Sequence, residues 1–216
     1  EMKAGDPAPC AEVDLSGGQD KGFALLKDIV GQTQFLLIPT RRLEGIESPE
    51  LLAADTPNYW EDAWKARHFV AAAAQAPLTR DDLGLAINSR FARSQSQLHI
   101  HLDCVKPRVK QALSQHAAEI GEAWAPLEIG PSGTHYLARR LDGEELSADP
   151  FHALAEGVAG ARDHMDRETL VVIGATYGDG SPGFYLLSDQ TDPTTGDRAS
   201  GEQLLDHSCA LAKGSP

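Results

Sequence analysis

The chain has 216 residues, of which 41% are hydrophobic, and a formal net charge of −13. This length and apolar content suffice for one domain with a sizeable core, and no long polar linker divides the sequence. The negative charge argues against nucleic acid or a strongly anionic membrane as the main electrostatic partner, because repulsion would oppose the encounter. No stretch approaches the roughly 18 to 20 apolar residues of a membrane span. We therefore expect one domain over residues 1–216, with 1–20 as an extended N-terminal segment.

The hydrophobic pattern predicts an α+β fold. Thr56-Pro57, a cap residue followed by a first-turn proline, indicates the start of a helix over 58–74. Hairpins with covering helices indicate an antiparallel sheet with helices packed mainly on one face. In chain order the predicted elements are a strand over 22–29, a strand over 34–40, a helix over 58–74, strands over 83–88 and 97–104, a helix over 107–120, a strand over 135–141, a helix over 150–158, strands over 169–177 and 183–189, and a helix over 199–212.

The strand QLHIHLDC, residues 97–104, carries the strongest functional signal. Successive side chains of a strand point to opposite faces, so strict polar/apolar alternation separates two sets here. The apolar set is predicted to face the core and consists of Leu98, Ile100, Leu102 and Cys104. The polar set is the candidate site and consists of Gln97, His99, His101 and Asp103.

Three chemistries use two histidines on one strand face. In metal binding, two neutral imidazoles supply two ligands and a third comes from elsewhere, here from a carboxylate such as Asp103. In nucleophilic catalysis at phosphorus, one imidazole attacks and its neighbour handles protons or phosphate oxygens. In the third, both rings are structural and hydrogen-bonded to the backbone. The two histidines alone leave all three open.

The connection before this strand indicates an anion site. It is basic and rich in hydroxyl and amide groups, and a hairpin would place those groups beside the imidazoles. Cationic and neutral donors suit phosphate oxygens, whereas the alternative is a solvated loop. The residues concerned are Asn88, Arg90, Arg93, Ser94 and Gln95.

The strand and its hairpin resemble the motif of the histidine-triad (HIT) superfamily of nucleotide hydrolases and transferases. In that motif three histidines alternate with apolar residues on one strand. His99 matches the nucleophile, His101 matches the third histidine, and Gln97 stands where the first histidine is expected. Ser94 lies three residues before the motif, where the superfamily often places a hydroxyl that contacts phosphate.

Several further blocks narrow the resemblance to the bacterial CDP-diacylglycerol pyrophosphatases, which share the glutamine variant of the motif. The blocks run almost from end to end of the chain in the right order. They are PCAEV from Pro9, LLKD from Leu25, FLLIPT from Phe35, ESP from Glu47, AINSR from Ala86, YLARR from Tyr136 and DHSC ending at Cys209.

This resemblance implies a HIT-like α+β fold and hydrolysis of CDP-diacylglycerol to CMP and phosphatidate. His99 would attack the cytidylyl phosphorus, and the covalent cytidylyl-histidine would then be cleaved by water. No metal and no cofactor is required in this scheme. In or close to the matched blocks, Lys27, Arg42 and Tyr136 are further candidate contacts to phosphate or substrate.

Members of the resembled family carry an N-terminal apolar signal or anchor segment and work on the periplasmic side of the inner membrane. The resemblance therefore implies membrane association through an N-terminal anchor, which we expect to have been removed from this sequence, a nucleotide-linked phospholipid as partner, and no role for nucleic acid. In an oxidising compartment we favour a disulfide between Cys104 and Cys209, and three unpaired thiols are the alternative.

The sequence leaves open alternatives to hydrolysis of CDP-diacylglycerol through His99. They are a broader nucleotide pyrophosphatase or nucleotidyl transferase, a metal-dependent phosphohydrolase, and a binding module without chemistry. The oligomeric state is also open. Surface or structural roles are assigned to His68, His116, His152, His164 and His207.

Overall fold

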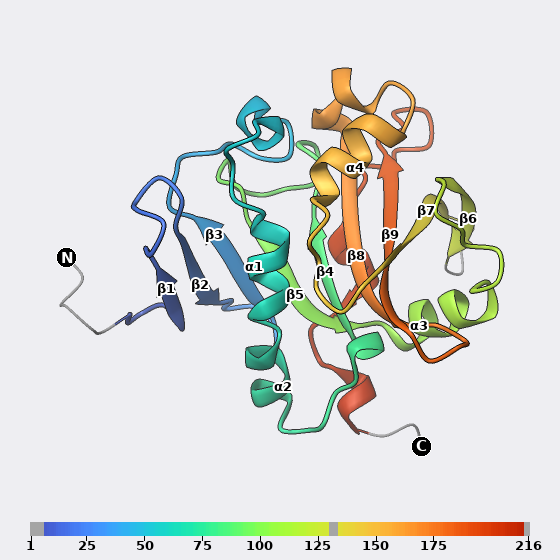
Figure 1. Ribbon diagram of the computed structural model, residues 1–216, viewed down its shortest axis with the longest axis horizontal. Coiled ribbons are helices and arrows are strands. Elements are labelled where there is room, and N and C mark those ends of the chain that lie inside the picture. The colour runs from blue at the N-terminus through green and yellow to red at the C-terminus, as the bar shows by residue number, and fades with distance from the viewer. Residues whose placement is uncertain (1–6, 130–133, 214–216) are drawn as a thin grey trace.

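The computed structural model describes residues 7–129 and 134–213, and its centre is one large antiparallel sheet (Figure 1). The strands follow the order β1-β2-β3-β5-β4-β8-β9-β7-β6, and β10 pairs with β5 outside this path. Neighbouring strands in this order are antiparallel, and so are β10 and β5. The predicted α+β class with an antiparallel sheet is confirmed.

The first five strands build the half of the sheet that carries the histidines. They are β1 Glu12–Asp14, β2 Phe23–Lys27, β3 Phe35–Pro39, β4 Leu83–Ile87 and β5 Ile100–Val105. The predicted β2–β3 and β4–β5 hairpins are present. β1, inside the segment that was predicted to be merely extended, pairs with β2 along its three residues. A strand of three residues is too short to show a polar/apolar alternation in the sequence.

The remaining strands are β6 Ala125–Ile129, β7 Thr134–Asp142, β8 Glu168–Thr176, β9 Pro182–Gln190 and β10 Leu205–Asp206. The predicted strand near 135–141 and the hairpin of 169–177 with 183–189 are confirmed. β6 was not predicted, and it forms the edge of the sheet. Its Pro126 weakened the strand pattern, yet an edge position tolerates a residue that cannot donate a backbone hydrogen bond.

The predicted helix over 58–74 is two short helices, α1 Tyr59–Lys65 and α2 His68–Ala74. The Arg67 side chain donates to the Trp64 carbonyl at 2.7 Å, and the Arg67 backbone N–H uses the same oxygen at 3.2 Å. In a continuous α-helix, the Trp64 carbonyl would accept the backbone N–H four residues later. Because Arg67 occupies this oxygen instead, the first helix ends and the chain turns here. The predicted cap is also wrong, because Asn58 rather than Thr56 accepts the N–H of Glu61.

The other helices are α3 Pro107–Gln115 and α4 Pro150–Gly157. Both begin with proline, as predicted, and α3 ends earlier than expected. Short 3₁₀ turns complete the chain at Pro49–Leu52, Arg80–Asp82, Ala161–Asp163, Met165–Arg167, Gly201–Leu204 and Ala210–Lys213. Within the described ranges, none of the helices is long and apolar enough to span a membrane.

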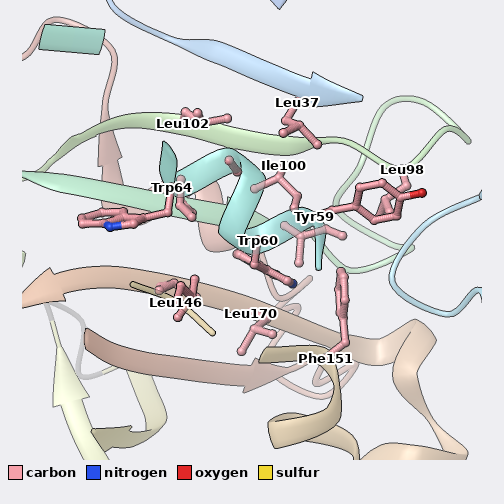
Figure 2. Packing of buried hydrophobic residues seen from close by; sticks show 14 of the residues in the cluster. Leu37, Tyr59, Trp60, Trp64, Leu98, Ile100, Leu102, Leu146, Phe151 and Leu170 are labelled. Atoms are coloured by element: carbon pink, nitrogen blue, oxygen red, sulfur yellow. The ribbon is translucent and has the colours of Figure 1, made fainter. Parts of the chain in front are cut away.

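The larger hydrophobic core lies between one sheet face and the helices α1, α2 and α4. Figure 1 shows α1 in front of β5 with α2 below it, and Figure 2 shows Trp60 of α1 between Ile100 and Leu170 and Trp64 between Leu102 and Leu146. The apolar set of the histidine strand is buried in this core as predicted, namely Leu98, Ile100, Leu102 and Cys104. Because the apolar set faces this core, the polar set of the same strand must lie on the opposite sheet face.

A second core on the other sheet face is covered by α3 and by the turn at Gly201–Leu204. It contains Val109 and Leu113 of α3 against Val171 and Leu187 of the sheet. Of the four α-helices in the described residues, three therefore cover one face, in agreement with the prediction. The polar set of the histidine strand lies beside this second core.

The predicted terminal helix over 199–212 is wrong. The segment instead forms two 3₁₀ turns with β10 between them, and β10 pairs Leu205 with Val105 and Asp206 with Cys104. A disulfide joins Cys104 to Cys209 at a Cα–Cα distance of 5.2 Å, the pairing that we favoured, and Cys10 is a free thiol. Pairing to β5 and the crosslink together override the helical pattern of this segment.

Candidate functional site

His99 lies immediately before β5, and its ring is partly exposed. Its Nδ1 is 2.7 Å from the Gln97 carbonyl oxygen, which only accepts hydrogen bonds, so Nδ1 carries the ring proton. The other nitrogen, Nε2, then has a free lone pair. Nε2 makes no hydrogen bond to any residue that the structure describes. This arrangement presents an imidazole nitrogen ready to act as a nucleophile.

His101 is the buried partner of His99, and the two ring centroids are 4.9 Å apart in an edge-on contact. Its side chain is 5% exposed, and burial lowers the pKa of His101 to about 4 despite the opposing charge of Glu202. The ring is therefore neutral at physiological pH. Its Nδ1 lies 2.6 Å from Nε2 of Gln34, and its Nε2 is buried with no partner among residues 7–129 and 134–213.

Asp103, the last polar residue of the face, is tied into a charged network with two residues of the C-terminal segment. His207 donates from Nδ1 to Asp103 at 2.7 Å and from Nε2 to Glu202 at 3.2 Å. Asp103 also accepts from the Thr33 hydroxyl at 2.6 Å and from the Cys104 N–H. We call this the Asp103–His207–Glu202 network. Because the Asp103 carboxylate accepts these three hydrogen bonds, it does not face His99 and His101 as a third metal ligand.

The charges of this network follow from its contacts. Hydrogen bonds to Asp103 and Glu202 raise the pKa of His207 to about 9, so the ring is an imidazolium. The hydrogen bond from His207 is the main reason that the pKa of Glu202 falls to about 2. His207 thus has a structural role, as predicted, but one beside the candidate site. Glu202 and Gln34 were not predicted, because they lie 101 positions after and 67 positions before His101.

The network makes a pH-dependent contribution to stability. Because the pKa of His207 is raised, its contribution is complete below about pH 6.5 and is lost as pH rises through about 9. We expect wild-type protein to lose about 2 kcal/mol more free energy of unfolding between pH 7 and pH 10 than His207→Gln, allowing for solvent screening of a side chain that is 28% exposed. Urea unfolding at both pH values measures the difference. Equal pH slopes for the two proteins would contradict it.

The β4–β5 connection brings three of the predicted contacts next to His99. Asn88, Arg93 and Gln97 line a small cavity of about 10 Å³ against it, with room for about one water molecule. The donors of Gln97 are engaged, because its amide nitrogen donates to the carbonyls of Pro39 and Arg41, each at 3.3 Å. Asn88 donates to Glu202 at 3.2 Å and accepts its N–H at 3.1 Å. These two amides thus hold the connection and the network in place around the histidine.

Arg93 was predicted to contact phosphate, and in the structure it forms a bidentate ion pair with Glu47. Both contacts are 2.6 Å, and the side chains are 7% and 17% exposed. Burial of Glu47 opposes its ionisation, but the guanidinium keeps the pKa of Glu47 below its usual value. Gly45 makes room for this pair, because a Cβ there would collide with Nη1 of Arg93. The pair anchors the connection to the segment after β3.

We therefore expect Arg93→Ala to act mainly on stability. It leaves the Glu47 carboxylate largely buried and unpaired, which should cost about 3 kcal/mol. The matched control is Arg42→Ala, since Arg42 is exposed and its side chain makes no hydrogen bond or ion pair within the described chain; its effect should stay within about 0.5 kcal/mol. Urea unfolding compares the two. An Arg93→Ala variant as stable as wild type would show that the ion pair does not anchor the connection.

The other predicted contacts divide into two groups. Arg42, Arg90 and Ser94 are exposed, and their side chains make no hydrogen bond or ion pair in the described part of the protein, so they are free to meet a ligand. Lys27 is engaged, because its ammonium donates to the carbonyls of Asp28 and Gly31. Their roles in binding stay predictions.

Tyr136 lies far from the histidines in the sheet order. It belongs to β7, and β4, β8 and β9 stand between that strand and β5. Its hydroxyl accepts a hydrogen bond from Gln203 at 2.8 Å, and its ring is buried in the second core. The structure thus gives Tyr136 a packing role and does not bring it to His99.

A hollow of about 690 Å³ on the surface includes neither His99 nor His101. Its lining contains Asp189, Asp192 and Asp197. Burial raises the pKa of Asp189 to about 7, yet the hollow remains acidic and suits a phosphate poorly. We therefore place the candidate site at the histidines, where the exposed arginine and hydroxyl groups lie nearby in the connection.

Comparison with known proteins gives the family of the chain. The family model described as CDP-diacylglycerol pyrophosphatase matches residues 1–213. The chain belongs to this family. A CDP-diacylglycerol pyrophosphatase from Yersinia pestis is 47% identical over 207 residues, which cover 95% of this chain and 77% of the relative. The family membership expected from the sequence blocks is confirmed.

Proposed function

We propose that the protein hydrolyses the pyrophosphate bond of CDP-diacylglycerol, with His99 as nucleophile. The observation that carries this proposal is the 2.7 Å contact from His99 Nδ1 to the Gln97 carbonyl, which places the proton of the neutral ring on Nδ1 and the lone pair on Nε2. Membership of the CDP-diacylglycerol pyrophosphatase family supports the substrate. A protein that only binds the nucleotide has no use for an oriented nucleophile.

The reaction proceeds in two displacements. In the first, Nε2 of His99 forms a bond to the cytidylyl phosphorus, and the bond from that phosphorus to the bridging oxygen breaks and releases phosphatidate. The ring proton stays on Nδ1, hydrogen-bonded to Gln97, so the cytidylyl-histidine is cationic. In the second, water attacks the same phosphorus, the P–N bond breaks, CMP leaves and one proton passes to solvent. Phosphatidate is a good leaving group, so the first step needs little protonation.

Catalysis then depends on donors that stabilise the negative charge of the phosphoryl oxygens. His101 is neutral and adjacent to His99. Arg90 and Ser94, on the exposed connection, have free side-chain donors. We propose that these three residues bind the phosphate oxygens through neutral and cationic donors, although the protein as a whole has a net charge of −13. Such a local site suits a small phosphorylated headgroup.

Hydrolysis in ¹⁸O-labelled water tests this function and its direction of attack. We expect release of CMP and phosphatidate, with one ¹⁸O in CMP and none in phosphatidate, because water attacks the cytidylyl phosphorus. Label in phosphatidate would contradict attack by His99 at that atom. Parallel assays with other nucleoside diphosphate derivatives measure how far the substrate range extends, and assays with alcohols measure transfer to acceptors other than water.

We also propose that the native protein works at the periplasmic side of a bacterial inner membrane, associated with it through an N-terminal anchor. The Cys104–Cys209 disulfide supports this location, because disulfides persist in oxidising compartments. The tip of the β2–β3 hairpin supports contact with lipid. There Ile29 is 99% exposed and Val30 is 55% exposed, in a turn tied down by Lys27.

Substitution at this tip separates contact with lipid from chemistry. We expect Ile29→Asp to lower the rate on CDP-diacylglycerol in zwitterionic vesicles about tenfold, because the change removes apolar surface and adds a charge at the bilayer. The rate on a short-chain, water-soluble analogue should be unchanged. Leu15→Asp, at another partly exposed aliphatic residue, is the control. Equal rates of wild type and Ile29→Asp on vesicles would contradict contact at the tip.

A further inference from the structure

Gln34 is fully buried just before β3, and its amide lies between His101 and Glu202. Its Nε2 is 2.6 Å from Nδ1 of His101 and 3.2 Å from Oε1 of Glu202. A side-chain amide has two N–H donors on one end and an acceptor on the other. The orientation of this amide therefore decides what His101 can do.

Glu202 fixes that orientation. Its carboxylate receives hydrogen bonds from His207 and Asn88 as well as Gln34, and these contacts keep it ionised. An ionised carboxylate only accepts, so the NH₂ end of Gln34 must face it. Turning the amide around would place two acceptors against each other in a buried site.

The second N–H of the same amide points to His101. Nδ1 of His101 must then accept, and a buried neutral imidazole with a bare Nδ1 carries its proton on Nε2. That Nε2–H is buried without a partner in the described structure, next to the ring of His99. The charged and titratable groups around His101 are His99, Glu202, His207 and Asp28, and none of them hydrogen-bonds its Nε2. A phosphate oxygen of the substrate would satisfy it.

We propose that Gln34 is a positioning residue that holds His101 as the Nε2–H tautomer, so that this ring donates a hydrogen bond to a phosphoryl oxygen while His99 attacks. The proposal rests on the proposed function for the identity of the phosphate. The chain of contacts runs from the Asp103–His207–Glu202 network through Gln34 to His101. It explains why a charged network is built behind a neutral histidine.

The tautomer is measured directly by ¹⁵N NMR of ring-labelled histidine in the free wild-type protein. We expect His101 to be protonated at Nε2 and bare at Nδ1. Gln34→Met keeps the size of the side chain but removes the donor, so the proton should move to Nδ1, which faces Glu202 at 3.5 Å. Gln32→Met is the matched control, because Gln32 is exposed on the same hairpin. A wild-type ring protonated at Nδ1 would overturn the proposal.

Kinetics give an independent readout. We expect Gln34→Met to lower kcat about 10²-fold with KM changed less than threefold, because the lost donor acts in the transition state. In a His101→Ala background, Gln34→Met should have no further effect, since Gln34 acts through that ring. An equal loss in both backgrounds, or an unchanged kcat, would overturn the role. If Gln34→Met fails to fold, Glu202→Gln replaces it, and a mixture of tautomers is then expected.

The two proposals fail in different ways. A wild-type protein that does not hydrolyse CDP-diacylglycerol refutes the proposed function, while its ring spectrum still tests the tautomer. An active wild-type protein with His101 protonated at Nδ1 refutes the role of Gln34 and leaves the function standing.

Discussion

His99→Ala is expected to lower kcat for CDP-diacylglycerol by at least about 10³-fold while the fold is retained. The variant removes the nitrogen that must bond to phosphorus in the first displacement. His99 is partly exposed and its ring makes one hydrogen bond, to a carbonyl of its own segment, so the loss of packing is small. Release of CMP measures the rate, and circular dichroism with urea unfolding measures the fold.

The control is His68→Ala. His68 lies on the exposed side of α2, and its Nδ1 also bonds a carbonyl of its own segment, that of Lys65. It therefore matches His99 in local contacts but not in position, and we expect wild-type activity. A folded His99→Ala variant with a near-normal rate would remove His99 from the reaction.

Loss of the disulfide is expected to have the largest effect on stability. Cys104 and Cys209 are 105 residues apart, and a crosslink over a loop of this length restricts the unfolded chain strongly. We expect Cys209→Ser to lower the free energy of unfolding by about 4 kcal/mol and Cys10→Ser, at the free thiol, by less than about 0.5 kcal/mol. Urea unfolding under non-reducing conditions measures both.

The disulfide variant should also lose activity, because the crosslink holds the segment that carries Glu202 and His207 against β5. We expect kcat to fall about tenfold at temperatures where Cys209→Ser is still folded. A variant that keeps both stability and kcat would show that β10 and the Asp103–His207–Glu202 network hold this segment without the crosslink.

The sequence was most informative where local pattern and packing agree. Alternation along residues 97–104 separated the buried apolar set from the polar set, and the structure buries Ile100 and Leu102 in the main core. The hairpin that leads into it was predicted from the turn-rich connection, and β4 pairs with β5 as expected. These features depend on neighbours within a few residues, which is the range that periodicity reports.

The support behind the histidines could not be predicted from local pattern. Gln34 meets His101 across 67 positions, and Glu202 meets Gln34 across 168. No periodicity connects residues so far apart. The prediction of a helix over 199–212 was wrong for the same reason. The conformation of this segment is decided by its pairing with β5 and by the disulfide to Cys104, both of which are distant in the sequence. Helical propensity is a weak preference that such tertiary contacts override.

The basic connection shows a further limit. Composition indicated donors for phosphate, yet it did not show that Glu47 already occupies the Arg93 guanidinium. Arg90 and Ser94 remain free, and this difference depends on which acidic residue lies opposite in space. Charge counts along a loop indicate the kind of ligand more reliably than they indicate the residue that binds it.

The most direct test of the central claim is the intact mass of the protein after rapid quenching with CDP-diacylglycerol in the presence of EDTA. If His99 is the nucleophile, a transient species heavier by one cytidylyl group appears in the wild type and is absent from His99→Ala. Peptide mapping should place the group on His99. Loss of all turnover on chelation, or turnover with no adduct at any quench time, would contradict covalent catalysis by His99.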